Sequence, residues 1–384
     1  SQFKKGNRPN ASIIDDNLVY TLAPHKMFNL SFIRENGFQF HPKAVVGEDQ
    51  LFVMQCYINA KVITVLADYD YYYVVSRGNE NLSLKYFAPE EFFFSFNRIM
   101  EFIHESGLND LYKKELKVAF LNRFLHASRL RGMLLSNRLT RQQKIDWLAE
   151  TKLFFDTHVD EGIEKKLEPR FHYFVQISRD NNLDKLLHIH KRIDKVTATD
   201  VTKIEDGLIY GRLKHVSKEI GYDEEIVVSH LNDSDVYIKN MDFGKKSFTL
   251  SGQFFQKLLL NVEVEYQLLL VHRSSGLELS NPVQIYNKSG EFEITIDYTR
   301  LLIDKKHTGP WDLFVEASVN GYKNRRRIGS NRSRKVKGIN RSNKVGSFRL
   351  SYTVRPYFTE KFDNISLDVK LPSTVMNKMV EGLG

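Results

Sequence analysis

The stretch "GEDQLFVMQCYINAKVITVLADYDYYYVV" (residues 47–75) joins two hydrophobic patterns of different period. Leu51, Met54 and Tyr57 recur at helical spacing in its first half, which predicts a helix. The second half is rich in β-branched and aromatic residues, which predicts a strand. Because a helix that alternates with strands is typical of α/β folds, residues 1–87 are predicted to be α/β.

Two adjacent carboxylates, Glu48 and Asp49, stand where the predicted helix begins. Acidic side chains at this position can accept the free N–H groups of the first turn, and they suit the positive end of the helix dipole. One of them could instead act as a general base. From the pair alone, capping is the more frequent role, because acidic residues are common in first turns.

Residues 88–200 have a helical pattern and are predicted to form a helical linker region. Pro89 suits the first position of a helix. Apolar stripes of this kind face packing partners, so they predict a core and not a ligand site. The three stripes consist of Phe92, Phe96, Ile99 and Ile103, of Leu116, Phe120, Phe124 and Ala127, and of Ile145, Leu148 and Phe155.

Residues 201–365 change to a period of two, with short apolar runs separated by Gly, Asn, Ser and Asp. The runs include "KSFTLSG", "VEVEYQLLLV", "EFEITID" and "WDLFVEASV". Strands at such spacing predict an immunoglobulin-like β-sandwich. Residues 366–384 are predicted to begin a second β module.

The composition limits the possible classes of partner and location. The net charge of +9 favours polyanionic partners such as nucleic acid, an anionic membrane face or a phosphate polymer. A single cysteine, Cys56, excludes an intrachain disulfide and fits a reducing compartment. The sequence has no run of about 18 consecutive apolar residues, so it indicates no membrane span. The predicted location is cytoplasmic, with the inner face of the plasma membrane as an alternative.

Two short motifs are weak candidates for metal binding. The "DYD" of Asp68–Asp70 has the carboxylates that hard cations prefer, but it lies within a tyrosine-rich strand pattern. His188 and His190 are two residues apart, so on a helix they do not face each other. Neither motif has the surrounding ligands that would make it specific.

The loop "VVSRGNENLSLKYF" (residues 74–87) has groups that suit a diphosphate. Arg77 could bind a phosphate oxygen in bidentate fashion, and Ser83 could donate to another. The alternative is an ordinary polar surface loop.

Residues 320–349 contain many Lys and Arg and no Asp or Glu. Such a block can be a solvated basic loop, or it can bind a polyphosphate by releasing counterions. It lacks the interleaved aromatic residues on which nucleic-acid bases stack, which disfavours a nucleic-acid site. The predicted polymer-binding residues are Arg325, Arg326, Arg327, Arg332, Arg334 and Lys335.

Four segments together resemble a known family. "IIDDNLVYTLAPHKMF", "GEDQLF", "YYYVVSRGNENLS" and "PYFTEKFDNISL" look like the wall teichoic acid β-N-acetylglucosaminyltransferases of Gram-positive bacteria, which are family 2 glycosyltransferases of the GT-A fold. The resemblance implies that Asp49 is the catalytic base and Glu48 its partner. It also implies that Arg77 and Ser83 bind the donor pyrophosphate. Asn81 stands where the family has a metal-binding His.

The resemblance implies an inverting transfer of N-acetylglucosamine from UDP-GlcNAc to poly(ribitol phosphate), with Mn²⁺ or Mg²⁺ as cofactor and a homotrimeric assembly. Residues 1–87 would then be the C-terminal half of a GT-A domain, and the chain would be an N-terminally truncated enzyme that is inactive alone. Two alternatives stay open. One is a non-catalytic module for polyanion binding and oligomerisation, and the other is a nucleic-acid binder.

Overall fold

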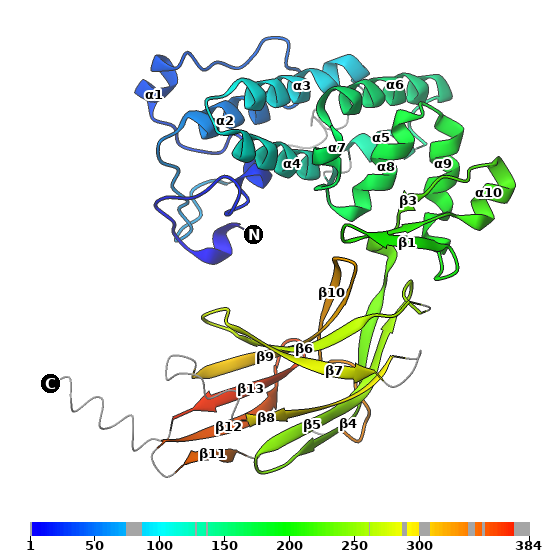
Figure 1. Ribbon diagram of the computed structural model, residues 1–384. Coiled ribbons are helices and arrows are strands. Elements are labelled where there is room, and N and C mark those ends of the chain that lie inside the picture. The colour runs from blue at the N-terminus through cyan, green and yellow to red at the C-terminus, as the bar shows by residue number, and fades with distance from the viewer. Residues whose placement is uncertain are drawn as a thin grey trace. The chain divides into compact units, whose positions relative to one another are not determined.

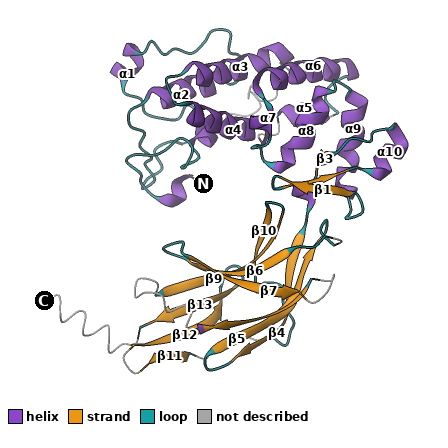
Figure 2. Cartoon of the chain, viewed as in Figure 1, coloured by secondary structure: helices purple, strands orange, loops and turns teal. Residues whose placement is uncertain are grey.

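The computed structural model describes residues 2–73, 87–126, 129–135, 137–260, 262–285, 290–298, 308–336, 342–347 and 350–371. The chain divides into two compact units, Ser1–Lys191 and Arg192–Gly384. Helices make up the first unit and strands dominate the second, as Figures 1 and 2 show. Among the described residues, no helix is both long enough and apolar enough to cross a membrane.

The first unit contains two short 3₁₀ helices and a series of α-helices. The 3₁₀ helices are η1 (Gln2–Lys5) and η2 (Leu18–Thr21), and the α-helices are α1 (Leu30–Glu35), α2 (Glu48–Asn59), α3 (Pro89–Glu105), α4 (Asp110–His126), α5 (Arg129–Leu135), α6 (Arg141–His158), α7 (Glu161–Glu164), α8 (Pro169–Arg179) and α9 (Leu183–Arg192). The predicted helices at residue 48 and at Pro89 are confirmed, with Pro89 in the first turn of α3.

Aromatic side chains of α3, α4 and α6 form the core of this unit. The ring centroids of Phe96 and Phe124 are 4.6 Å apart, and those of Phe92 and Trp147 are 4.9 Å apart. The predicted stripes are buried here with one exception, since Ile145 is 37% exposed. The predicted core position Ala127 lies outside the described residues.

The strand predicted after α2 is wrong for its described residues. Only Val65 forms a β-bridge, with Arg8, and one further backbone bond joins Ala11 to Ile63. A strand needs a continuous partner along its length, and the described chain offers only this short segment. The tyrosines that suggested a strand, Tyr69 and Tyr71–Tyr73, are exposed. Residues 2–73 therefore contribute helices and irregular chain, and the α/β pattern is not seen there.

The second unit begins with a small three-stranded antiparallel sheet. Its strands are β1 (Val201–Glu205), β2 (Leu208–Gly211) and β3 (Ile226–Val227), in that order. The 3₁₀ helices η4 (Ile193–Lys195) and η5 (Ser229–Leu231) and the helix α10 (Lys214–Ile220) belong to the same part of the chain.

A ten-stranded antiparallel sheet follows. It consists of β4 (Ser234–Phe243), β5 (Ser247–Gln256), β6 (Glu265–His272), β7 (Glu278–Ile285), β8 (Glu291–Asp297), β9 (Gly309–Val319), β10 (Tyr322–Arg327), β11 (Asn343–Ser347), β12 (Leu350–Phe358) and β13 (Ile365–Lys370). The strand order is β11-β12-β13-β9-β6-β7-β8-β5-β4, and β10 also pairs with β9.

The predicted β-rich region is confirmed, but its described strands form one connected sheet and not two separate ones. β7 joins the two halves of the sheet, which are β11-β12-β13-β9-β6 and β8-β5-β4. It pairs with β6 along its length and with β8 at Gln284 and Ile285. The sheet bends around a single core that contains Ile238 of β4 as well as Val354 of β12. Figure 1 shows the strands of both halves lying over one another.

The predicted boundary between residues 365 and 366 falls inside β13. This strand pairs with β12 on one side and with β9 on the other. Leu367 and Val369 belong to the same core as the rest of the sheet. The first residues assigned to a second β module are therefore part of the first, and residues 372–384 lie outside the described chain.

Part of the edge of β4 is covered by residues 331–333 of the basic segment (residues 320–349). The N–H of Ile238 donates to the carbonyl of Asn331 at 3.0 Å, and the N–H of Ser333 donates to the carbonyl of Ile238 at 2.8 Å. Arg332 and Ile238 form a parallel bridge. Part of the basic segment is thus fixed against the sheet.

The close pairing of β4 and β5 generates a testable prediction at Gly252. A Cβ atom at this residue would lie 2.2 Å from the backbone oxygen of Tyr237. We expect Gly252→Ala to lower the free energy of unfolding of the second unit by roughly 1–3 kcal/mol, because the strands must move apart. Denaturant unfolding followed by Trp311 fluorescence, in a Trp147→Phe background, would measure it.

Gly107→Ala is the matched control, since a Cβ atom there would meet nothing within 4 Å. Equal stabilities of the two alanine variants would contradict the close approach of β4 and β5.

Candidate functional site

The first turn of α2 lies against α3 because of Gly47. This residue precedes α2 with φ 75° and ψ 19°, a left-handed conformation that favours glycine. A Cβ atom on Gly47 would lie 3.4 Å from Cβ of Ser95 and 3.6 Å from the ring of Phe96, both in α3. The glycine therefore permits both the turn and the close contact.

Asp49 takes part in capping, as its position in the sequence suggested. Its Oδ1 accepts the backbone N–H of Gln50 at 2.8 Å, and Gly47 has no side chain that could cap the helix. Glu48 and Asp49 are both half-buried. Capping uses one oxygen of Asp49 and leaves its second oxygen available for another role.

A cavity of about 350 Å³ adjoins this turn. One part of its lining is polar and the other is aromatic, which suits a ligand with both hydroxyl groups and apolar C–H faces. The lining residues are Val45, Val46, Gly47, Glu48, Asp49, Gln50, Phe87, Phe92, Phe96, Arg123 and Phe124.

Arg123 connects α4 to the first turn of α2. Its Nη1 donates a hydrogen bond to Oε1 of Gln50. Burial lowers the pKa of Arg123, and the negative charge of Asp49 opposes this shift. An arginine from the helical linker thus fixes the residue next to Asp49 and lies within electrostatic range of its carboxylate.

Lys26 is a second cation near Asp49. Its Nζ donates to the carbonyl of Ala23 at 2.9 Å and to that of Thr21. Burial lowers the pKa of Lys26 to about 8, and Asp49 opposes this shift. Asp49 is therefore a carboxylate beside a cavity that interacts electrostatically with two partly buried cations.

Sequence reasoning identified Glu48 and Asp49 but missed Gln50, Arg123, Lys26 and the aromatic lining. The two stripes that contain Phe92 and Phe96 and that contain Phe124 were assigned to the core, and these side chains are indeed almost wholly buried. Arg123 precedes the buried Phe124 in the sequence of α4, which is the one signal that could have marked it.

The other predicted site residues either lie outside the described residues or have partners away from the described lining of this cavity. Arg77, Asn81 and Ser83 lie outside the described residues. Asp68 accepts a hydrogen bond from the Tyr71 hydroxyl at 3.1 Å. His190 contacts the Tyr173 hydroxyl at 3.0 Å.

The described residues also provide a test for the predicted divalent metal. Across the described ranges, no three His, Cys, Asp or Glu side chains come together as a ligand group. The described part of the site therefore does not by itself supply the carboxylate or imidazole set that would hold Mn²⁺ or Mg²⁺.

The six predicted polymer-binding residues fall into two groups. Arg325 pairs with Glu278 at 2.6 Å and with Glu316 at 2.9 Å. Arg332 pairs with Asp363 at 2.7 Å.

Arg327 binds Asp312, so Arg325, Arg327 and Arg332 are all held by carboxylates of the second unit. Arg326, Arg334 and Lys335 are exposed, and Arg326 donates to the Ser234 hydroxyl at 2.7 Å.

Two domain families match this chain. Residues 89–190 match the "Glycosyl transferase TarS linker domain", and residues 230–369 match the "TarS beta-glycosyltransferase C-terminal domain 1". The chain is a relative of the poly(ribitol-phosphate) β-glycosyltransferases. The resemblance to wall teichoic acid glycosyltransferases that the sequence predicted is confirmed.

Two poly(ribitol-phosphate) glycosyltransferases show the extent of the match. A β-glucosyltransferase of Bacillus spizizenii is 31% identical over 96% of this chain and 58% of its own length. The β-N-acetylglucosaminyltransferase TarS of Staphylococcus aureus is 26% identical over 96% of this chain and 62% of its own length. The chain thus spans about three fifths of these relatives.

Two crystal structures of S. aureus TarS share the fold. The first has a TM-score of 0.51 at 20% identity and covers 96% of this chain and 62% of that chain. The second, of TarS 1-349 in complex with UDP-GlcNAc, has a TM-score of 0.50 at 23% identity and covers 59% of this chain and 62% of that chain. The mixture of helices and sheet, with a helical linker, is therefore that of TarS.

The burial of Lys26 generates a prediction about pH. The folded state releases the Lys26 proton near pH 8, whereas an unfolded lysine keeps it until about pH 10.4. Between these values the unfolded state binds more protons, so the stability of the folded state rises with pH. We expect the stability of wild type relative to Lys26→Met to increase from pH 8 to pH 10.

Denaturant unfolding followed by Trp147 fluorescence, in a Trp311→Phe background, measures this difference. Lys61→Met is the control, because it removes a lysine that is exposed to solvent just after α2. A pH-independent difference for Lys26→Met would contradict the burial of its ammonium group.

Proposed function

We propose that this chain is part of an enzyme that transfers a sugar from a UDP-sugar to a hydroxyl of poly(ribitol phosphate). The observation that carries the proposal is the position of Asp49, whose half-buried carboxylate lines the cavity at the start of α2. The names of the relatives supply the reaction class.

Asp49 is the general base in this proposal. Its carboxylate accepts the proton of an acceptor hydroxyl while that oxygen forms a bond to the anomeric carbon of the donor sugar. The bond from the anomeric carbon to the diphosphate breaks, and UDP leaves with the bonding electrons. One displacement inverts the anomeric configuration, so a single base is sufficient. Glu48 and Arg123 are positioned beside the reacting hydroxyl.

The cavity suits a polyol or sugar. Its carboxylates and Arg123 can exchange hydrogen bonds with hydroxyl groups, while Phe87 and the other aromatic residues can contact C–H groups. Arg77 and Ser83 remain the predicted donor ligands. Asn81 remains the predicted metal ligand, and no step of the proposed mechanism depends on a metal.

The choice of donor is open between two sugars. N-acetylglucosamine was predicted from the sequence, and it agrees with the name of TarS and with its complex with UDP-GlcNAc. The Bacillus relative, at the higher identity of 31%, is a glucosyltransferase. Assays should therefore compare UDP-GlcNAc with UDP-glucose.

A second candidate function is a polyanion-binding and oligomerisation module. The exposed cations Arg326, Arg334 and Lys335 favour it. The two functions are compatible, because binding a polymer raises its concentration near a catalytic site on the same protein.

The base assignment predicts the effect of Asp49→Asn. Sugar transfer should be measured with a protein that includes this chain and the residues encoded on either side of it. We expect the variant to lose transfer by roughly two or more orders of magnitude, because asparagine cannot accept the proton. An amide oxygen can still cap the helix, so the fold should be kept.

Asp110→Asn is the matched control, since Asp110 is also an acidic residue in a first turn, that of α4. It should retain normal transfer. Near-normal turnover by Asp49→Asn would exclude Asp49 as the base.

A further prediction concerns assembly. We infer that the β-rich unit drives homo-oligomers, with a trimer as the form implied by the resemblance and closed symmetry as the general expectation. Light scattering of the 384-residue chain at micromolar concentration should give a mass above 44.9 kDa. A monomer across that concentration range would count against the assembly.

A further inference from the structure

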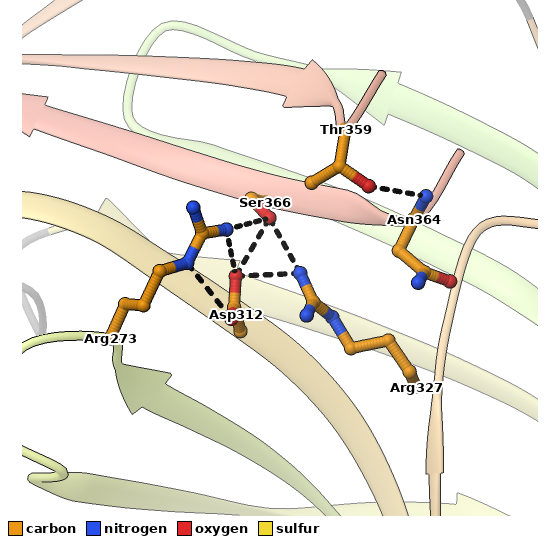
Figure 3. A network of polar contacts seen from close by, with 6 residues as sticks. All are labelled: Arg273, Asp312, Arg327, Thr359, Asn364 and Ser366. Carbon is orange, nitrogen blue, oxygen red and sulfur yellow. Dashed lines mark hydrogen bonds and ion pairs between the residues drawn. The ribbon is translucent and has the colours of Figure 1, made fainter. Parts of the chain in front are cut away.

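Two arginines share one carboxylate on the face of the sheet opposite its core. Nη2 of Arg273 lies 2.6 Å from Oδ1 of Asp312, and its Nε lies 3.2 Å from Oδ2. Nη2 of Arg327 also lies 2.6 Å from Oδ1 of Asp312 and 2.8 Å from the hydroxyl of Ser366. Figure 3 shows the two guanidinium groups approaching Asp312 from opposite sides.

A second carboxylate on this face of the sheet also contacts two cations. Asp368 contacts Nη2 of Arg355 at 3.4 Å and Nζ of Lys370 at 3.1 Å. Asp368 is two residues after Ser366 in β13, so both groups are on the same face and about 6.6 Å apart along the strand. Each carboxylate thus has two cations.

Both groups have one more positive charge than negative charge, and this distinguishes them from the neighbouring ion pairs of Lys323 and Arg325 in β10. Arg325 and Lys323 contact two carboxylates, Glu278 and Glu316, and that group is neutral. Arg273 already occupies both oxygens of Asp312. Arg327 therefore brings a second positive charge, and in the described part of the chain its Nε is buried without a hydrogen-bond partner.

Three of the four cations of the two groups are well exposed to a ligand, and the fourth, Arg327, has a side chain that is 24% exposed. The side chains of Arg273, Arg355 and Lys370 are 46%, 50% and 65% exposed, whereas those of Asp312 and Asp368 are 13% and 12% exposed. An anion that approaches this face meets the cations and not the carboxylates. Tyr357 is the cross-strand neighbour of Ser366, so it lies in the same row of the sheet as Asp312.

We propose that this face binds phosphate groups of the polyol-phosphate acceptor, with Arg273 and Arg327 at one phosphate and Arg355 and Lys370 at another. Phosphate oxygens accept paired hydrogen bonds from guanidinium groups, and each bound phosphate supplies the negative charge that its group lacks. Binding along a polymer also releases counterions. The inference rests on the proposed function, and it places acceptor binding on the β sheet in addition to the cavity at Asp49.

If these ion pairs only stabilised the sheet, a second cation at each carboxylate would not be needed. One bidentate arginine is sufficient to satisfy a carboxylate, and a second partly buried cation adds repulsion and desolvation. Arg273→Gln leaves Asp312 with Arg327, so it makes the group neutral and should leave the fold intact. Lys370→Gln does the same for Asp368.

The first experiment measures thermal unfolding of the 384-residue chain in inorganic phosphate and in chloride at equal ionic strength. We expect phosphate to raise the unfolding temperature of the wild type, and to do so less in Arg273→Gln and Lys370→Gln, because an anion that binds the folded state stabilises it. In Asp312→Asn, where two arginines have no carboxylate, the gain from phosphate should be larger than in wild type.

The second experiment measures binding of poly(ribitol phosphate). Arg273→Gln should weaken binding roughly tenfold, as expected for the loss of hydrogen bonds to a charged group. The slope of log affinity against log salt should fall by roughly 0.7 for each lost contact.

Arg212→Gln is the matched control for both experiments. Its side chain is also 46% exposed, but it faces two carboxylates, Asp223 and Glu225. Equal losses in Arg273→Gln and Arg212→Gln, or no phosphate response in any variant, would overturn the proposal.

A third arm replaces the polymer with vesicles that contain anionic phospholipid. Binding of vesicles but not of polymer, lost in Arg273→Gln, would overturn the assignment to the acceptor. None of these readouts depends on sugar transfer. A failure here would leave the role of Asp49 untouched, and normal transfer by Asp49→Asn would leave this site untouched.

Discussion

Gly47 begins α2 with a left-handed backbone, and the geometry of the candidate active site depends on this constraint. Because the residue has no side chain, α2 can start in contact with Ser95 and Phe96 of α3. The first turn then presents Asp49 to a cavity that is also lined by residues of α3 and α4. The hydrogen bond from Arg123 to Gln50 fixes this turn from the side of the linker helices. The linker is thus part of the site, and its role goes beyond separating two other regions.

Charge is distributed unevenly in the second unit. The net charge of +9 favoured polyanionic partners, but many of the cations of β10 are held by carboxylates. An excess of positive charge remains locally in the described chain, where two cations contact one carboxylate. Such sites have a fixed geometry, since the guanidinium groups are held by the sheet before any ligand arrives. A preorganised cation pair loses less conformational entropy on binding than flexible lysines in a loop would.

The sequence predicted features that depend on local pattern. The helix at residue 48, the helix at Pro89 and the period-two strands after residue 201 follow from spacing and turn residues alone. It failed at residues 61–73, because a strand needs a partner and no sequence pattern shows whether one is present. It also could not show that β7 would join two halves into one sheet. Asp49 was predicted from its motif, whereas Arg123 and Lys26 were missed because their interaction with it depends on tertiary structure.

The pairing of Ile238 with Asn331 and Ser333 has a consequence for solubility. β4 is the last strand in the order of the sheet, and a bare edge of ten residues would offer unpaired N–H and C=O groups to other chains. Residues 331–333 occupy part of that edge and place Arg332 and its neighbours there. Positive charge at a strand edge discourages the addition of another strand. Residues 331–333 of the basic segment (320–349) therefore protect the folded protein from aggregating through β4.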